Sequence, residues 1–416
     1  GILGIGEFAW RYGLSTWVVF GVPYYLFAVI FAFVLAPRIR RSNVLSIPDR
    51  LEEVYGRPTA LVGAVLTFLL VNPAPYVLMM GLLSHMAFGG PLWLHLLIGL
   101  GVSGVFLLVG GFRSGVMTNV VEFVMMYAGF AVMVALALPA VGGLSGLAAR
   151  VPPLHLVPGG GHDVQYIAVW FLIALWTMVD PSFHQRSAAA KDERTARNGI
   201  LVSVVFWFLF DAMTVSTGMV ARALLPDLDQ PALAYPALAV LILPDGLRGV
   251  FFVGLFATIM STLTSMLMLG GLTAGRDVAA RWKRVDDETR IQRWVRVGTV
   301  FSGLLAVALA LLVPSVVTLW YTVGTALIPG LLIPVLGSYL PFFRLRGKAM
   351  LPLMVSGSCV STGSLAWGYL RAVDGVPQYW WGVEPLLPGL AVTILLWLLG
   401  RWMERRSPAA PERAPE

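Results

Sequence analysis

Hydroxyl side chains line one face of an apolar segment between residues 249 and 272. Thr258, Ser261, Thr262 and Ser265 occupy positions i, i+3, i+4 and i+7, so a helix places all four on one side. In membrane helices such hydroxyls commonly bond to the carbonyl four residues earlier. The alternative is ion binding, because hydroxyls and freed backbone carbonyls are oxygen ligands that suit Na⁺. The spacing alone leaves both interpretations open.

A carboxylate and a proline adjoin in another apolar segment, at Asp180 and Pro181. Proline removes a backbone N–H and clashes with the preceding turn, so we expect the helix to break or kink there. Broken membrane helices free backbone groups that transporters use for binding. We therefore interpret Asp180 and Pro181 as a binding site. The alternative is that Asp180 only caps the helix that follows.

Three further carboxylates lie in apolar surroundings, at Glu7, Glu122 and Asp211. Ionisable side chains inside membrane segments are costly, so they are functional candidates by default. Glu7 follows Gly1, Gly4 and Gly6, and each glycine weakens a helix by about 1 kcal/mol. This first segment is therefore either unwound beside a bound molecule or packed closely against another helix.

The composition identifies the membrane setting of these residues. Apolar residues make up 58% of the chain and charged residues 12%, against about 25% charged in soluble domains. We therefore expect an all-α integral membrane protein, which excludes a soluble enzyme. About 20 apolar residues cross a bilayer core of roughly 30 Å, and twelve segments qualify if the first is part of a longer helix. They are 1–10, 18–36, 60–86, 92–110, 117–138, 166–179, 201–220, 249–272, 297–313, 319–343, 350–370 and 386–399.

Alternation of these segments divides the basic residues unequally between the two sides. One side holds 24 of the 29 Lys and Arg residues, and that side is cytoplasmic by the positive-inside rule. Because the basic residues lie in short loops, we expect the lipid bilayer and no nucleic acid as a partner. We predict one membrane domain over residues 1–403 in the cell membrane. Residues 404–416 are predicted to form a polar, disordered cytoplasmic tail.

Motifs of known enzymes are missing from the sequence. It contains no Gly-x-Ser-x-Gly, Walker or dinucleotide-binding pattern, so we expect no enzyme activity and no organic cofactor. His155, His162 and His184 lack the spacing of metal ligands, and we interpret them as surface or interfacial residues.

Several stretches of the sequence resemble the sodium:solute symporter family, which includes sodium/glucose, sodium/proline and sodium/pantothenate cotransporters. The most specific are Gln185-Arg186 followed by Lys191, and Ser261-Thr262. The matching stretches are 4–13, 46–56, 110–122, 181–192, 261–265 and 275–277. The resemblance covers nearly the whole chain.

The resemblance implies the leucine-transporter fold, in which two inverted five-helix repeats place broken first and sixth core helices around a midplane site. Residues 1–10 then form the second half of the first core helix, and 166–179 begin the sixth. The last two segments, 350–370 and 386–399, are implied to be peripheral.

Residue roles follow from the same resemblance. Ser261 and Thr262 match hydroxyl ligands of a sodium site between the first and eighth core helices, and Thr258 matches a carbonyl ligand. Asp180 matches a solute-contacting position. Asn119 stands where an Asp is common, and Glu122 where a Gln is common.

The implied function is symport of Na⁺ with a small polar organic solute. The loss of a carboxylate at Asn119 favours one sodium ion rather than two, with sodium the sole metal and coupling ion. Proton coupling is an alternative, because Glu122, Asp180 and Asp211 are titratable, and Asn119, Glu122 and Asp211 are candidates for an ion pathway. A membrane sensor with this fold is a further alternative, although the sequence shows no output domain.

Overall fold

Helices make up nearly all of the ordered backbone. The computed structural model describes residues 1–42, 44–346 and 349–406, and only the backbone of 108–118. Within these ranges the sole strand-like pairing is an isolated bridge between Val373 and Val376. Nine spans of the described chain are long and apolar enough to cross a membrane, so the all-α membrane class is confirmed. They are Trp17–Val34, Arg57–Phe88, Asn119–Ala140, Val164–Ala189, Glu193–Leu224, Asp245–Lys283, Glu288–Leu312, Val316–Tyr339 and Leu386–Arg406.

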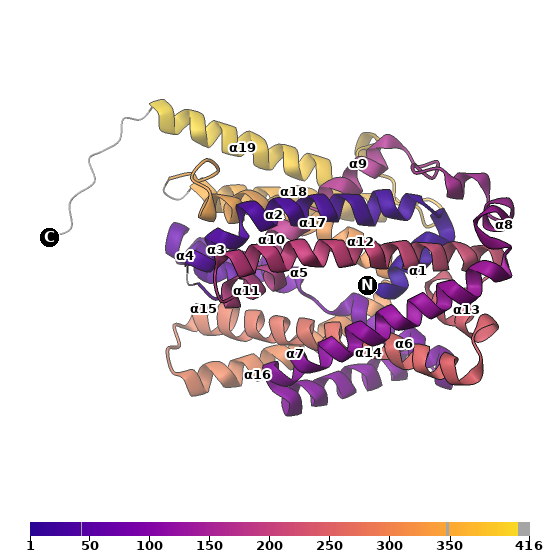
Figure 1. The fold of residues 1–416 in the computed structure, drawn as a ribbon. Coiled ribbons are helices and arrows are strands. Elements are labelled where there is room, and N and C mark those ends of the chain that lie inside the picture. Colours follow the sequence, from indigo (N-terminus) through magenta and orange to yellow (C-terminus); the bar gives the residue numbers. More distant parts are fainter. Residues whose placement is uncertain (43, 347–348, 407–416) are drawn as a thin grey trace.

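The helices run roughly parallel to one long direction of the molecule (Figure 1). In chain order they are α1 (Ile2–Tyr12), π-helix η1 (Trp17–Gly21), α2 (Val22–Val34), α3 (Ala36–Ser42), α4 (Ile47–Tyr55), α5 (Arg57–Leu70), α6 (Ala74–Phe88), α7 (Leu92–Ala140), α8 (Gly143–Arg150), 3₁₀-helix η2 (Pro153–Leu156), α9 (Val164–Ile173), α10 (Trp176–Val179), α11 (Pro181–Ala189), α12 (Glu193–Leu224), 3₁₀-helix η3 (Pro231–Leu233), α13 (Ala234–Ile242), α14 (Asp245–Leu272), π-helix η4 (Thr273–Ala280), α15 (Arg281–Lys283), α16 (Glu288–Leu312), α17 (Val316–Tyr339), α18 (Met350–Leu370), 3₁₀-helix η6 (Trp380–Gly382) and α19 (Leu386–Arg406).

The segment predicted at 60–86 is two helices, α5 and α6, separated at residues 71–73. Pro73 and Pro75 cannot donate backbone hydrogen bonds, so the first helix ends before them. The Asn72 side-chain oxygen accepts from the backbone N–H of Ala74 at 3.0 Å, which caps the second helix. The prediction of one unbroken helix was therefore wrong, because it counted apolar residues and ignored the two prolines.

The segments predicted at 92–110 and 117–138 are joined into one helical run, α7, of 49 residues. A straight helix of that length would extend about 74 Å. The first part of α7 packs Leu96 beside Gly81 of α6, and the second part packs Phe130 against Phe251 of α14. The loop predicted between them is helical backbone in the structure, since glycine without proline permits a helix there.

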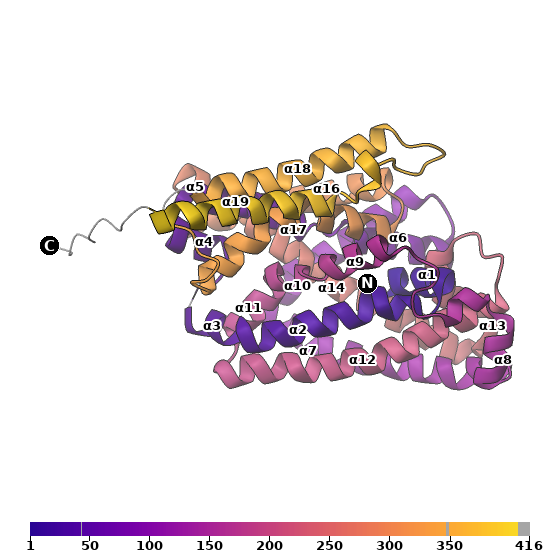
Figure 2. The same cartoon turned by 90° about the horizontal axis from the view of Figure 1, so that it is seen from above.

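Several short elements had no apolar run long enough to predict them. Helix α4 is amphipathic, and Ser46 caps it by accepting from the Asp49 N–H at 3.2 Å. Helix α13 and π-helix η4 likewise lie outside the predicted boundaries. Helices α18 and α19 lie side by side at one edge of the bundle, as Figure 2 shows, which agrees with their predicted peripheral place.

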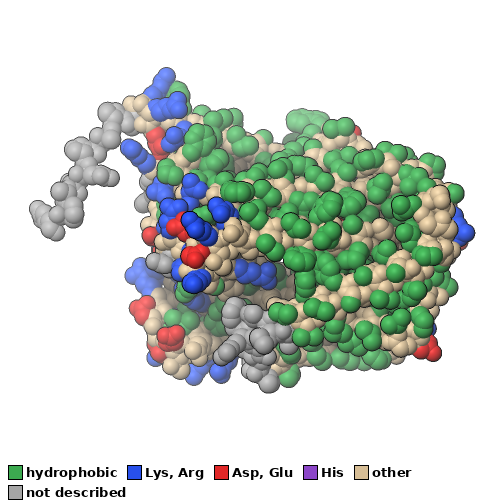
Figure 3. Space-filling model, in the orientation of Figure 1, with side chains coloured by type: hydrophobic (Ala, Val, Ile, Leu, Met, Phe, Trp, Pro, Cys, Tyr) green, Lys and Arg blue, Asp and Glu red, His purple; other side chains and the backbone are tan. Residues whose placement is uncertain are grey.

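Basic side chains gather at one end of the molecule, and hydrophobic side chains cover its middle (Figure 3). This basic end comprises α3, α4, α15 and the last turn of α19. Residues that are distant in the sequence contact one another there. Arg41 pairs with Glu193 at 2.8 Å, and the Arg50 guanidinium donates to the Ser338 carbonyl at 2.7 Å. The alternation of apolar segments along the sequence predicted that these same stretches lie on one side of the membrane.

We predict that residues 276–296 face the cytoplasm, because they contain seven basic residues. Single cysteines placed at exposed positions between α15 and α16, in a variant whose Cys359 is replaced by Ala, should react with a membrane-impermeant maleimide only after the cells are opened. Cysteines in the loop after α8 serve as the control and should react in intact cells. Labelling of these cysteines in intact cells would contradict the predicted orientation.

Candidate functional site

The predicted helix break at Asp180 and Pro181 is present, between α10 and α11. Asp180 has extended backbone angles, φ −72° and ψ 116°, and Pro181 is the first residue of α11. One oxygen of Asp180, Oδ1, accepts from the N–H groups of Ser182 at 2.7 Å and Phe183 at 3.3 Å, and from the Ser182 hydroxyl at 2.6 Å. Asp180 therefore caps α11, as the second interpretation of the sequence held.

The cap occupies only part of the Asp180 carboxylate. Its other oxygen, Oδ2, makes no hydrogen bond to the part of the chain that the structure describes. The hydroxyls of Tyr24 in α2 and Tyr76 in α6 lie within electrostatic range of this carboxylate. Helix α10, which ends just before Asp180, also contacts α2 directly, and Tyr76 lies one turn after the break at residues 71–73.

Two polar groups in this region were not singled out from the sequence. Asn72 is buried, and its Nδ2 has no hydrogen-bond partner among the described residues. Tyr76 follows one turn later. The signal that could have found them is the pair of prolines directly after Asn72, because prolines inside an apolar run mark a break.

The hydroxyl stripe on α14 has the back-bonded geometry. Thr258 donates to the Gly254 carbonyl at 2.8 Å, and Thr262 donates to the Thr258 carbonyl at 3.2 Å. Ser261 also points at the Thr258 carbonyl, at 3.4 Å. A hydroxyl that donates its hydrogen keeps lone pairs for a cation, so this geometry leaves the ion-binding interpretation open. Helix α14 contacts α1, the other helix of the expected site.

The remaining carboxylates have distinct surroundings. Glu122 of α7 approaches the Ser261 hydroxyl, while its Oε2 has no hydrogen-bond partner among the described residues. Asp211 accepts from the Tyr25 hydroxyl, which in turn accepts from Trp17 Nε1 at 3.1 Å. Asn119 is exposed, one turn before Glu122.

Glu7, the carboxylate of the first segment, forms an ion pair with Arg11 at 3.2 Å. The pair lies within one helix turn of α1. Gly4 and Gly6 of this helix lie against Trp320 and Tyr235, where an added Cβ would come within 3.0 Å of each ring. The glycines therefore serve close packing, and α1 is helical rather than unwound.

The end of α1 farthest from the basic end is clamped by residues from distant parts of the chain. His155 bonds through Nε2 to the Trp10 carbonyl at 3.0 Å, and the Trp10 indole donates to the Leu225 carbonyl at 3.0 Å. Gly13 has φ +59° and lies so close to the His155 backbone that a side chain would not fit. His155 and His184 are buried, which contradicts the surface half of their predicted surface or interfacial location.

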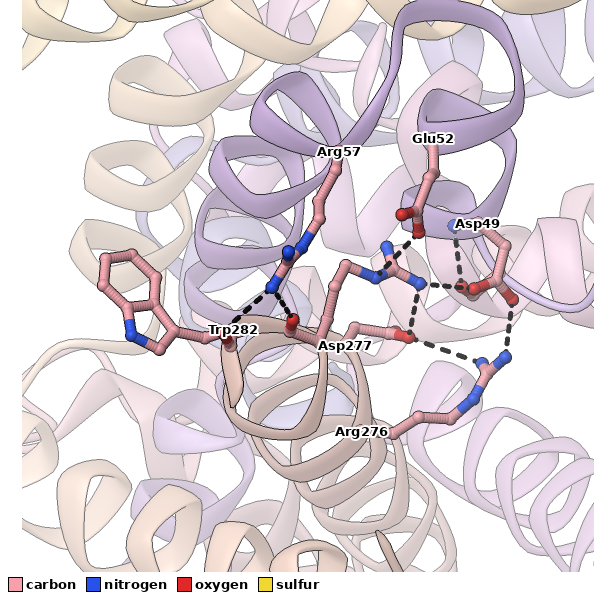
Figure 4. A network of polar contacts seen from close by, with 8 residues as sticks. Asp49, Glu52, Arg57, Arg276, Asp277 and Trp282 are labelled. Carbon is pink, nitrogen blue, oxygen red and sulfur yellow. Dashed lines mark hydrogen bonds and ion pairs between the residues drawn. The ribbon is translucent and has the colours of Figure 1, made fainter. Parts of the chain in front are cut away.

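An ionic network at the basic end joins α4 to η4 and α15 (Figure 4). Asp49 pairs with Arg276 at 2.9 Å and with Arg281 at 2.5 Å. Asp277, which is 3% exposed, pairs with both arginines at 3.4 and 3.6 Å. Removing one partner of a buried ion pair leaves an uncompensated charge, which is unfavourable. The network therefore holds α4 against η4 and α15.

Solved transporters share this arrangement of helices. A Na⁺-coupled sialic acid symporter in a substrate-bound, outward-open state superposes with a TM-score of 0.67 at 14% identity, over 96% of this chain and 89% of that chain. Mhp1, a nucleobase-cation-symport-1 family transporter, in a closed conformation gives 0.61 at 15% identity, over 99% and 90%. The predicted leucine-transporter fold is confirmed.

The sequence comparisons identify the family. Residues 1–340 match the model of the sodium:solute symporter family, and the chain belongs to that family. It is 27% identical to the sodium/pantothenate symporter of Escherichia coli, over 94% of this chain and 82% of that protein. It is 26% identical to human sodium/glucose cotransporter 4 over 76% of this chain, and it spans about half of that relative, 51%. These relatives are transporters and not enzymes.

We predict that the His155 clamp weakens in acid. Burial lowers the pKa of His155 and Arg222 lowers it further, while the bond to Trp10 opposes this. The folded protein therefore takes up this proton less readily than the unfolded chain. The contribution of neutral His155 to stability is complete above its ordinary pKa of about 6.5 and is lost as the pH falls below it.

The measurement is the melting temperature of the purified protein between pH 7.5 and 5, compared with that of His155→Gln. Glutamine retains a donor for the Trp10 carbonyl but does not titrate, so the variant should lose less stability on acidification. Titration of other groups cancels in the comparison. Equal slopes for the two proteins would contradict the prediction.

Proposed function

We propose that the protein is a secondary transporter that couples Na⁺ entry to uptake of a small polar organic solute across the cell membrane. Membership of the sodium:solute symporter family and the sodium coupling named for its relatives support this. The observation that carries the proposal is the α10–α11 break, where a carboxylate oxygen without a hydrogen bond lies near two tyrosines and a second helix break. The C-terminus is then cytoplasmic.

The sodium site in this proposal is formed by Thr258, Ser261 and Thr262 on α14, a helix that also contacts α1. Rotation of the Ser261 and Thr262 hydroxyls away from the Thr258 carbonyl would free three oxygens within one helix turn. Hydroxyl and carbonyl oxygens bind Na⁺ without adding a fixed negative charge to the membrane interior. The family resemblance gives the remaining ligands of this site to backbone carbonyls of the first core helix.

The solute site is formed by Asp180 and Pro181 in this proposal, with Asn72, Tyr24 and Tyr76 as additional polar groups. Asp180 Oδ2 is an acceptor, and Asn72 Nδ2 is a buried donor without a partner among the described residues. A molecule that offers both an acceptor and a donor would satisfy these groups. Because Na⁺ binds the outward-open conformation more tightly, it favours that conformation and the solute site within it. Alternating access then exposes the same site to the opposite side of the membrane.

Proton coupling is the second candidate, and one contact favours it. Glu122 approaches Ser261 on the opposite helix, so a titratable carboxyl adjoins the proposed sodium site. Asn119, Glu122 and Asp211 would then form the ion pathway. Uptake driven by a proton gradient in Na⁺-free buffer, and lost in Glu122→Gln, would favour this candidate over sodium coupling.

Replacing Ser261 and Thr262 together with alanine should raise the Na⁺ concentration needed for half-maximal transport roughly 5- to 150-fold. Two hydroxyl ligands are removed, each worth about 0.5–1.5 kcal/mol. Folding should survive because alanine is a good helix former. The measurement is solute uptake into proteoliposomes as a function of Na⁺ concentration.

Ser203→Ala with Ser216→Ala is the matched control, because both hydroxyls of α12 also bond to the carbonyl four residues earlier. This pair should leave the Na⁺ dependence unchanged. If the Ser261 and Thr262 variant keeps the wild-type Na⁺ dependence, the sodium site lies elsewhere.

Asp180→Asn should weaken the binding of a solute that carries an amine roughly 10- to 150-fold. The change removes the charge but keeps the size and the helix cap, since asparagine caps as well as aspartate. The charge-assisted hydrogen bond that is lost is worth about 1.5–3 kcal/mol. Binding is measured by thermal stabilisation with a panel of amino acids, sugars, carboxylates and vitamins, in Na⁺ and in K⁺.

Asp192→Asn is the matched control, because Asp192 caps α12 by accepting from the Thr195 N–H at 2.7 Å. It should leave both solute and Na⁺ binding intact. Loss of Na⁺ binding alone in Asp180→Asn would transfer Asp180 to the ion pathway. Unchanged binding of every stabilising solute and of Na⁺ would refute the solute role.

A further inference from the structure

An apolar groove opens on the membrane surface between α5, η4 and α16, close to the basic end. Its volume is about 210 Å³. It is lined by Val65 and Phe68 of α5, by Val278 and Ala279 of η4, and by Trp294 and Phe301 of α16. Val65 and Phe301 are 44% and 54% exposed. Exposed apolar side chains on membrane-spanning helices face lipid, so the groove faces the bilayer.

The two ends of the groove differ. Phe68 and Phe301 stack across it with ring centroids 5.8 Å apart and close the end toward the membrane interior. At the other end, Trp294 lies beneath the Lys283 ammonium, which is 4.5 Å from the ring centroid. Tryptophan and lysine together are typical of the membrane–water interface. The groove therefore runs from the interface into the hydrocarbon region.

Positive charge surrounds the interfacial mouth. Arg57 lies on the same face of α5 as Val65 and donates to the Trp282 carbonyl at 2.9 Å, beside Lys283 (Figure 4). Within the described ranges, no carboxylate lies within 4.0 Å of Arg57 or Lys283. Arg290 stands one turn before Trp294 on α16, and its only ion pair there is an exposed one with Asp287 at 3.5 Å.

We propose that this groove binds an anionic phospholipid. One acyl chain occupies the apolar part between α5 and α16, and the phosphate contacts Lys283, Arg57 and Arg290. Along α5, Val65 lies about 12 Å and Phe68 about 16 Å beyond Arg57 at 1.5 Å per residue. This depth matches a headgroup at the mouth and a chain running below it. The charge at the mouth selects an anionic lipid over a zwitterionic one.

The proposed site is independent of transport. The groove lies on the outer surface of η4, whereas Asp277 of the same helix faces the ionic network with Asp49 and Arg281. A lipid bound there would contact η4 and α16 without entering the solute region. The test therefore uses lipid binding and does not require a known solute.

The experiment is native mass spectrometry of the purified full chain titrated with phosphatidylglycerol, with phosphatidylcholine of the same acyl chains, and with inorganic phosphate. Phosphatidylglycerol should bind most tightly, and phosphate alone should not bind. Lys283→Gln with Arg290→Gln should weaken phosphatidylglycerol binding about 10- to 30-fold, since each interfacial cation contributes roughly a factor of 5. Ala279→Leu, which fills the groove without changing charge, should weaken both phospholipids.

Arg194→Gln with Arg405→Gln is the control, because it removes the same charge from exposed positions at the basic end away from the groove. It should retain wild-type lipid affinity, and melting temperatures without lipid verify that each variant folds. Equal loss of affinity in the control would show non-specific attraction and overturn the proposal. Unchanged phospholipid binding in Ala279→Leu would also overturn the proposal. If this variant instead loses a dimer and keeps its lipid affinity, the groove binds a second copy of the chain and the proposal is again overturned.

Discussion

A helix that breaks inside a membrane must find partners for the backbone groups it frees, because no water is available there. This constraint governs the centre of the molecule. At the α10–α11 break, Asp180 accepts from two backbone N–H groups and the His184 side chain bonds to the Met178 carbonyl at 2.9 Å. At the α5–α6 break, Asn72 performs the same role for Ala74. Polar groups near the breaks that are not used to satisfy the freed backbone are available to a bound molecule.

The ionic network at the basic end joins elements from the two halves of the fold. Asp49 lies just before α5, in the first half, whereas Arg276 and Arg281 end the long α14–α15 segment in the second half. A movement that separates these halves at the basic end must break both pairs. Asp49 would then lose both arginines, which stay paired with Asp277 on their own segment, so separation has an electrostatic cost.

Much of this architecture could be predicted from the sequence. The membrane class and the break at Asp180 followed from apolar runs and one proline, which act locally, whereas the fold followed from the family resemblance. The break at residues 71–73 also depends on local sequence, because Pro73 and Pro75 predict it. Hydropathy alone does not predict it, because the whole segment is apolar. The continuity of α7 could not be predicted, because a glycine-rich stretch without proline is compatible with either a loop or a helix.

The candidate site was harder to predict than the fold. Residue types at Thr258, Ser261 and Thr262 indicate oxygen ligands, but whether the hydroxyls bond to their own helix depends on rotamers. The roles of Asn72, Tyr24 and Tyr76 depend on which helices meet, and spacing along the chain does not contain that information. Burial of His155 and His184 likewise results from tertiary packing, which overrides the preference of histidine for surfaces.

The clamp on α1 has a consequence for how the protein is made. Trp10 bonds to Leu225, 215 residues later in the chain, and Leu14 donates to the His155 carbonyl at 2.9 Å. A ribosome adds about 5–20 residues per second, so roughly 10 to 40 s separate the synthesis of Trp10 from that of its partner. During this interval α1 must wait in the translocon or the lipid without its final contacts. Helix α1 is thus made well before its distant partner is available, and this interval gives a membrane chaperone time to act on it.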